Sequence, residues 1–122
     1  DKEPCITGTG EQSRDFTYVT DTVEGIIRIG KCPETKGMYI NIARGENQRM
    51  DSVVESICSI MNYKGNIKYL PERKGDVKIH WADTKLAEEM LDFKAKIGIM
   101  EGLRRTVEWW KKEGLTLLPT QP

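Results

Sequence analysis

The feature that most constrains the fold is the segment MYINIA at residues 38–43. It is a near-continuous apolar run bounded by Gly37 and Gly45. A short apolar run between glycines is typical of a strand buried on both faces, and such strands are parallel more often than not. This segment therefore predicts a buried strand, and the rest of the chain decides what accompanies it.

Apolar residues recur at helical spacing in four other segments. The expected helices begin at Thr20 or Asp21, cover about residues 50–62, carry Leu86, Ala87, Met90 and Leu91 after Asp83, and cover about residues 99–113. Thr20 or Asp21 can cap the first helix, Asp83 can cap the third, and Gly30 and Pro33 end the first. Four helices are therefore expected.

Four short strands are expected besides residues 38–43. They lie at residues 4–7, 15–19, 66–70 and 77–81. In the last, Val77, Ile79 and Trp81 alternate with Lys78 and His80, which predicts a half-buried strand. The pattern as a whole predicts a single α/β domain over residues 1–122, with small sheet pieces and a flexible tail at residues 114–122.

The composition excludes several classes of partner. The 122 residues include 19 basic and 19 acidic side chains, so the balance favours neither nucleic acid nor an anionic membrane. No apolar run approaches the roughly 20 residues that span a bilayer, and no signal peptide is visible. The three cysteines have no metal-ligand spacing, which favours reduced thiols in a cytoplasmic protein.

The stretch ITGTGEQSRDFTYV at residues 6–19 has glycines spaced like those of a dinucleotide-binding loop. That loop needs a third small residue followed by a helix, and here Gly8 and Gly10 are followed by a strand-like run. The context favours a turn between two strands, for which glycine supplies the positive φ. The turn places Gln12 and Arg14 at the mouth of a strand.

Two places carry groups that could bind an anion. Arg14 beside a strand is a bidentate donor for phosphate or carboxylate, although residue type alone favours a salt bridge to Asp15 or another neighbour. Pro71 and Gly75 form a turn that presents three charged residues together, namely Arg73, Lys74 and Asp76. This turn can grip a phosphate and a ribose diol, or it is simply a solvated hairpin turn.

No catalytic constellation is visible in the sequence. His80, the single histidine, lies on the polar face of its expected strand and is interpreted as a surface residue. Trp81, Trp109 and Trp110 could stack on sugars, but tryptophans at such positions are more often core residues. No metal-ligand spacing, nucleophile–histidine order or paired-carboxylate site is present.

Three ordered motifs carry a resemblance to a known family. The segment GTGEQSRDFTYVTDTVEGI resembles GdGxQxRDFxYVdDvv, MYINIARGENQRMDSVVESI resembles fNigxGxxxSvxelaexi, and residues 69–112 resemble a closing stretch with RxGDv and eGL. These motifs belong to the extended short-chain dehydrogenase/reductase family, the NAD-dependent nucleotide-sugar epimerases and dehydratases. The match runs from about residue 4 to 113 and implies the C-terminal, substrate-binding part.

The resemblance also shows what these residues lack. Family members begin with a Rossmann domain that binds NAD, and they carry a Tyr-x-x-x-Lys pair for proton and hydride transfer. No tyrosine of this chain is followed four positions later by lysine. The resemblance therefore implies no catalytic or NAD-binding residue here, and no activity for these residues alone. A free-standing, non-catalytic binding or interaction module remains the alternative.

Motif by motif, the resemblance implies a substrate site. Arg14, Arg73 and Asp76 match the residues that hold the diphosphate and ribose of the sugar nucleotide, with UDP-sugars as the commonest ligands, and Gln12 is a weaker candidate. Pairing with the Rossmann domain, or self-association through exposed apolar surface, is expected. Arg49 and Gly98 replace the family's usual capping Ser or Thr, which should weaken two helix starts by about 1 kcal/mol or less.

Overall fold

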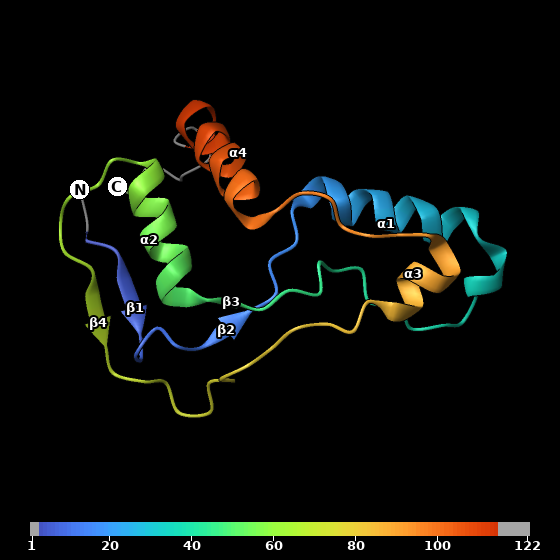
Figure 1. Cartoon of the computed structure of the whole chain (residues 1–122), viewed down its shortest axis with the longest axis horizontal. Coiled ribbons are helices and arrows are strands. Elements are labelled where there is room, and N and C mark those ends of the chain that lie inside the picture. Colours follow the sequence, from blue (N-terminus) through green and yellow to red (C-terminus); the bar gives the residue numbers. More distant parts are fainter. Residues whose placement is uncertain (1–2, 115–122) are drawn as a thin grey trace, which may run out of the picture.

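The computed structural model describes residues 3–114 and shows an elongated mixed α/β molecule (Figure 1). In chain order its elements are β1 (Cys5–Thr7), β2 (Ser13–Arg14), α1 (Val19–Lys31), the 3-10 turn η1 (Pro33–Thr35), β3 (Gln48–Arg49), α2 (Met50–Ile60), β4 (Lys68–Leu70), α3 (Lys85–Leu91) and α4 (Ile99–Lys112). The four predicted helices and the small sheet pieces are confirmed. The flexible tail predicted at residues 114–122 lies, apart from its first residue, outside the described residues.

The strands form two small ladders. β1 pairs in parallel with β4, Cys5 opposite Lys68, and β2 pairs antiparallel with β3. A single parallel bridge joins Ser13 to Ile79, and the Ser13 amide donates to the Lys78 carbonyl at 2.8 Å. The segment from β1 to β2 is therefore held by three segments that lie far away in the sequence.

Three predicted strands are wrong. Residues 15–19 leave the strand conformation after Arg14, and α1 begins at Val19. Residues 38–43 form no strand, and Tyr39 is 98% exposed. Residues 77–81 contribute only the bridge at Ile79. A strand exists only where a neighbouring strand completes its hydrogen bonds, and within residues 3–114 no strand pairs with residues 38–43.

The predicted cap of α1 is also wrong. Tyr18 occupies the N-cap position without a side-chain hydrogen bond, and Asp21 lies inside the helix as a buried residue. Thr84 occupies the N-cap position of α3, and the Asp83 carboxylate accepts from the Lys85 amide at 2.9 Å. The Asp83 carboxylate therefore binds the first amide of α3, but the predicted N-cap position belongs to Thr84.

The main hydrophobic core lies where α3 packs against the end of α1. It consists of four buried residues, Ala87, Leu91, Phe93 and Ala95, against which Ile29, Cys32, Ile40, Ile42 and Met90 pack. Gly25 of α1 lies directly against Ile42, leaving no room for a side chain. A second contact joins α2 to α4 on the other side of the molecule (Figure 1).

Much apolar surface is left uncovered. On α1, the side chains of Val19, Val23, Ile26 and Ile27 are between 45% and 62% exposed. The three tryptophans, predicted to be core residues, are about half exposed, so that prediction is wrong. Between residues 3 and 114, no helix has both the length and the apolar character needed to cross a membrane.

Candidate functional site

The candidate site is a groove of about 410 Å³ beside β1 and the start of α2. Apolar side chains such as Ile6, Phe16 and Val54 line one part of it. Its polar lining consists of four residues that the sequence analysis singled out, Gln12, Arg14, Arg73 and Asp76, together with Thr7 and Cys5. The fold therefore brings all four candidate residues to one groove.

The glycine turn connects strands β1 and β2, as predicted. Gly8 and Gly10 have φ values of +77° and +83°, a conformation that other residues adopt only with strain. The Gly10 carbonyl accepts from the Asp51 amide at 3.0 Å and the Gln12 carbonyl accepts from the Met50 amide at 2.9 Å. A side chain at Gly10 would lie 2.8 Å from the Asp51 Cβ, so glycine is needed here.

These two bonds explain how α2 begins without a conventional cap. Arg49 at its N-cap makes no side-chain capping bond, and neither does Gly98 before α4, as the sequence predicted. The first amides of α2 are instead satisfied by carbonyls of the glycine turn. The glycine turn itself leads into β2 and does not open directly on a helix, unlike the loop of a dinucleotide site.

Arg14 is fixed by three acceptors. Its Nη1 donates to the Ser13 carbonyl at 2.8 Å and to the Val77 carbonyl at 2.6 Å. Its Nη2 lies 2.8 Å from Oδ1 of Asp76, 62 positions away in the sequence. Arg14 is therefore part of an ion pair, as the alternative had it, but its partner is the candidate residue Asp76 and not Asp15.

The predicted turn at residues 71–77 presents the other two candidates. Gly75 has φ +82° and the Asp76 amide donates to the Arg73 carbonyl at 3.1 Å. Among the described residues, the Arg73 guanidinium makes no hydrogen bond or ion pair. The groove thus holds one fixed arginine and one free arginine.

Gln12 and the remaining candidates play lesser parts. The Gln12 amide nitrogen donates to the Thr7 carbonyl at 2.6 Å, which closes the glycine turn, and the residue lines the groove. His80 is exposed, as predicted. In residues 3–114 no cluster of three His, Cys, Asp or Glu side chains could hold a metal.

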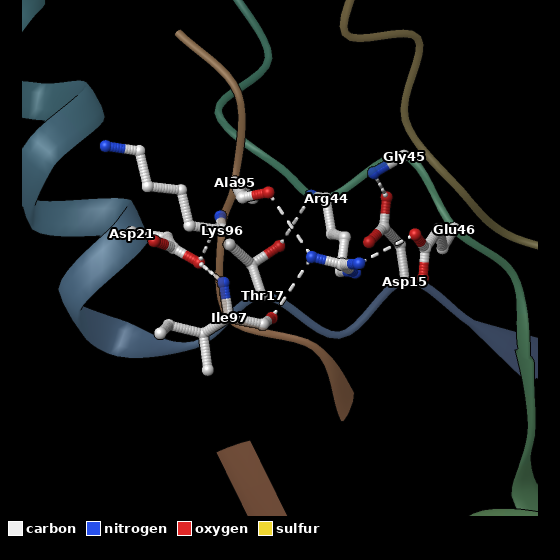
Figure 2. Close-up of polar contacts among 9 residues, drawn as sticks. All are labelled: Asp15, Thr17, Asp21, Arg44, Gly45, Glu46, Ala95, Lys96 and Ile97. Atoms are coloured by element: carbon white, nitrogen blue, oxygen red, sulfur yellow. Dashed lines mark hydrogen bonds and ion pairs between the residues drawn. The ribbon is translucent and has the colours of Figure 1, made fainter. Parts of the chain in front are cut away.

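Two carboxylates, those of Asp15 and Asp21, bind backbone amides that the sequence did not predict as their partners. Oδ2 of Asp15 accepts from the Gly45 amide at 2.9 Å and from the Ala82 amide at 3.2 Å. Oδ2 of Asp21 accepts from the Lys96 and Ile97 amides at 3.1 and 2.8 Å (Figure 2). The sequence gives no local indication of these hydrogen bonds, because the partners of the two carboxylates lie 30 to 76 positions away.

Arg44, which the sequence analysis missed, joins the same network. Its Nη1 lies 3.3 Å from both the Ala95 and the Ile97 carbonyls, and its amide donates to Oγ1 of Thr17 at 3.1 Å (Figure 2). The Nη2 of Arg44 lies 2.8 Å from Oε1 of Glu46 and forms an ion pair with it. Hydrogen bonds therefore attach residues 15–21 to segments from three other parts of the chain.

An ion pair perturbs one carboxyl group at the edge of the glycine turn. The Arg49 guanidinium lies 2.6 Å from Oδ2 of Asp51. This hydrogen bond, together with the Ser52 amide, lowers the pKa of Asp51 from 3.8 to about 2, and it raises the pKa of Arg49. Asp51 is therefore ionised at every physiological pH.

The groove carries cationic and carboxylate groups that can bind a polar ligand. Two guanidinium groups can neutralise a diphosphate, and a carboxylate can accept hydrogen bonds from vicinal hydroxyls. Arg14 and Asp76 are each about 30% exposed, so both can be reached from solvent. The geometry supports recognition of an anionic, hydroxyl-bearing ligand.

Comparison with known proteins identifies the family. The family model described as GDP-mannose 4,6 dehydratase matches residues 1–106. A UDP-glucuronate 4-epimerase of Thermodesulfobacterium geofontis is 37% identical over 114 residues, which are 93% of this chain and 34% of that protein.

Solved structures agree with this assignment. The structure of the epimerase Mth375 from Methanothermobacter thermautotrophicus superposes with a TM-score of 0.88 at 28% identity, over 93% of this chain and 34% of that one. UDP-glucuronic acid 4-epimerase from Bacillus cereus, in complex with UDP-glucuronic acid and NAD, gives a TM-score of 0.84 at 26% identity, over 91% and 36%. The chain thus spans about a third of the length of the relatives it matches. It belongs to the GDP-mannose 4,6 dehydratase family, among the NAD-dependent nucleotide-sugar epimerases and dehydratases of the extended short-chain dehydrogenase/reductases.

Proposed function

We propose that the chain is the nucleotide-sugar-binding, C-terminal part of an NAD-dependent epimerase or dehydratase of the UDP-glucose 4-epimerase kind. The observation that carries the proposal is the groove in which Gln12, Arg14, Arg73 and Asp76 meet. The pairing of β1 with β4 and the bridge between Ser13 and Ile79 bring the two turns together, although they lie about 60 positions apart in the sequence.

The groups in the groove suggest a division of roles. Arg73, which is free among the described residues, supplies the first positive charge for the diphosphate, and Arg14 supplies the second. Asp76 accepts hydrogen bonds from the ribose hydroxyls, and Gln12 offers its amide oxygen nearby. Each charge-assisted hydrogen bond is worth roughly 1.5 to 3 kcal/mol, so two arginines would give measurable affinity for a nucleoside diphosphate.

The relatives support a UDP-sugar over other nucleotides. The relatives named above include a UDP-glucuronate 4-epimerase and a structure that holds UDP-glucuronic acid and NAD. The family model carries the name of a GDP-sugar enzyme, so the base is the point that most needs a direct measurement.

Calorimetric titration of the chain with UDP and with GDP tests the proposal. Wild type should bind UDP more tightly than GDP, and Arg14→Ala and Arg73→Ala should each weaken UDP binding about ten-fold or more, the equivalent of about 1.4 kcal/mol. Lys74→Ala is the matched control, because Lys74 lies in the same exposed turn but does not line the groove. Absence of UDP binding in wild type, or equal losses in all three variants, would contradict the proposal.

We further propose that the 122 residues are not catalytic by themselves. We expect no turnover of a sugar nucleotide, even with added NAD, because the sequence holds no Tyr-x-x-x-Lys pair and the glycine turn leads into a strand instead of a helix. NAD and the proton-transfer groups would come from a Rossmann domain. Turnover by the purified chain would reject this part of the proposal.

The uncovered apolar surface supports pairing with such a domain or self-association. The apolar face of α1, together with Met38 and Tyr39, is exposed to an extent that is unusual in a stable monomer. Sedimentation velocity should show dimers or larger species at high concentration, and a strict monomer would count against pairing. The free Cys5, Cys32 and Cys58 suit the reducing cytoplasm, and a thiol count below three in freshly isolated protein would argue otherwise.

A further inference from the structure

The two candidate ligand residues Arg14 and Asp76 are bound to each other. Nη2 of Arg14 lies 2.8 Å from Oδ1 of Asp76, and the two side chains are 30% and 28% exposed. The pair therefore lies at the groove surface, where an incoming anion and the Asp76 carboxylate would compete for the same guanidinium edge.

Arg14 does not depend on Asp76 to stay in place. Its Nη1 is held by the Ser13 and Val77 carbonyls at 2.8 and 2.6 Å, and both bonds remain when the carboxylate leaves. Asp76 follows Gly75, whose φ of +82° marks a tight turn, and its side chain makes no other bond among the described residues. The carboxylate can therefore swing away while the guanidinium keeps its orientation.

We propose that Asp76 determines specificity by acting as an internal competitor for Arg14. A ligand that carries phosphates alone must displace the carboxylate and leave it without a partner. A nucleoside diphosphate displaces it as well, but its ribose hydroxyls give the released carboxylate new hydrogen bonds. The exchange thus favours nucleoside diphosphates over pyrophosphate and over simple sugar phosphates. This inference rests on the function proposed above.

The variant Asp76→Asn separates competition for Arg14 from binding of the ribose hydroxyls, because it removes the charge and keeps the size of the side chain. Removing a competitor should raise affinity for inorganic pyrophosphate, up to about five-fold on the scale of a partly exposed ion pair. Losing the carboxylate should weaken UDP binding, so that the preference for UDP over pyrophosphate falls about ten-fold or more. The matched control is Glu72→Gln, which loses the same charge from an exposed position in the same turn.

The test is calorimetric titration of wild type, Asp76→Asn and Glu72→Gln with UDP and with pyrophosphate, with urea unfolding to show that each variant is folded. Opposite changes in the two affinities for Asp76→Asn, absent in Glu72→Gln, are expected. The inference would be overturned if both variants gained pyrophosphate affinity equally, or if Asp76→Asn gained none. UDP binding by wild type would still support the proposed function in either case. If Asp76→Asn gained affinity for pyrophosphate but neither it nor wild type bound UDP, competition by Asp76 for Arg14 would be supported. The proposed function would then be rejected.

Discussion

Replacing Asp21 by alanine should destabilise the chain strongly and at a defined place. The carboxylate is only 7% exposed, and its Oδ2 accepts from the amides of Lys96 and Ile97 at 3.1 and 2.8 Å. These bonds attach the segment before α4 to the first turn of α1. Without them, two partly buried amides lose their acceptor and the two helices lose their connection.

The size of the effect follows from the number of bonds. Leaving a buried donor unsatisfied costs about 1 to 3 kcal/mol, and water can reach part of this site, so we expect Asp21→Ala to lower the free energy of unfolding by about 2 to 3 kcal/mol. Asp21→Asn should cost about 1 kcal/mol, because one oxygen accepts both bonds and the amide oxygen of asparagine can replace it. Glu24→Gln, which removes a charge from an exposed position of the same helix, should change little.

Urea unfolding of the three variants measures these differences, and hydrogen exchange locates them. The Lys96 and Ile97 amides should exchange roughly thirty-fold faster in Asp21→Ala than in wild type, the factor that corresponds to about 2 kcal/mol. If Asp21→Ala and Glu24→Gln lost the same free energy, or if exchange at these two amides were unchanged, the reasoning from the two bonds would be refuted.

Two further predictions concern α1 and the start of α2. Gly25→Ala should destabilise the chain by about 1 to 3 kcal/mol, because the new methyl group would overlap Ile42. Gly30→Ala in the same helix meets nothing within 4 Å and should stabilise the chain by about 0.5 kcal/mol. Thermal unfolding should therefore show a lower melting temperature for the first variant and a higher one for the second. The hydrogen bond from Arg49 lowers the pKa of Asp51 from 3.8 to about 2, so the carboxyl contributes stability above about pH 3.8 that is lost as the pH falls toward 2. Asp51→Asn should flatten the fall in unfolding free energy over that range, and an Asp51 pKa near 4 by NMR titration would contradict this.

The helices could be predicted from the sequence because their signal is local. The spacing of apolar residues located α2 and α4 to within one or two residues of their ends. The strands could not be predicted in the same way, since a strand depends on a neighbour. The apolar run at residues 38–43 has the composition of a buried strand, but among the described residues nothing pairs with it and Tyr39 stands in solvent.

The groove was predictable only in part. Motif resemblance selected Arg14, Arg73 and Asp76, and the fold brings them to one groove. Their mutual geometry was not predictable, because the ion pair between Arg14 and Asp76 joins residues 62 positions apart. The amide partners of Asp15 were not predictable for the same reason, since they are identified by position in space and not by residue type.

The bonds of Asp15 and Asp21 have a consequence for how the sequence can vary. Each carboxylate recognises backbone N–H groups, among them those of Ala82, Lys96 and Ile97, and ignores the side chains attached to them. Those three positions are therefore open to many substitutions without loss of the connection. Proline is the exception, because it has no N–H to donate. It alone would remove the hydrogen bond at any of these three positions, where nearly all other residues would keep it.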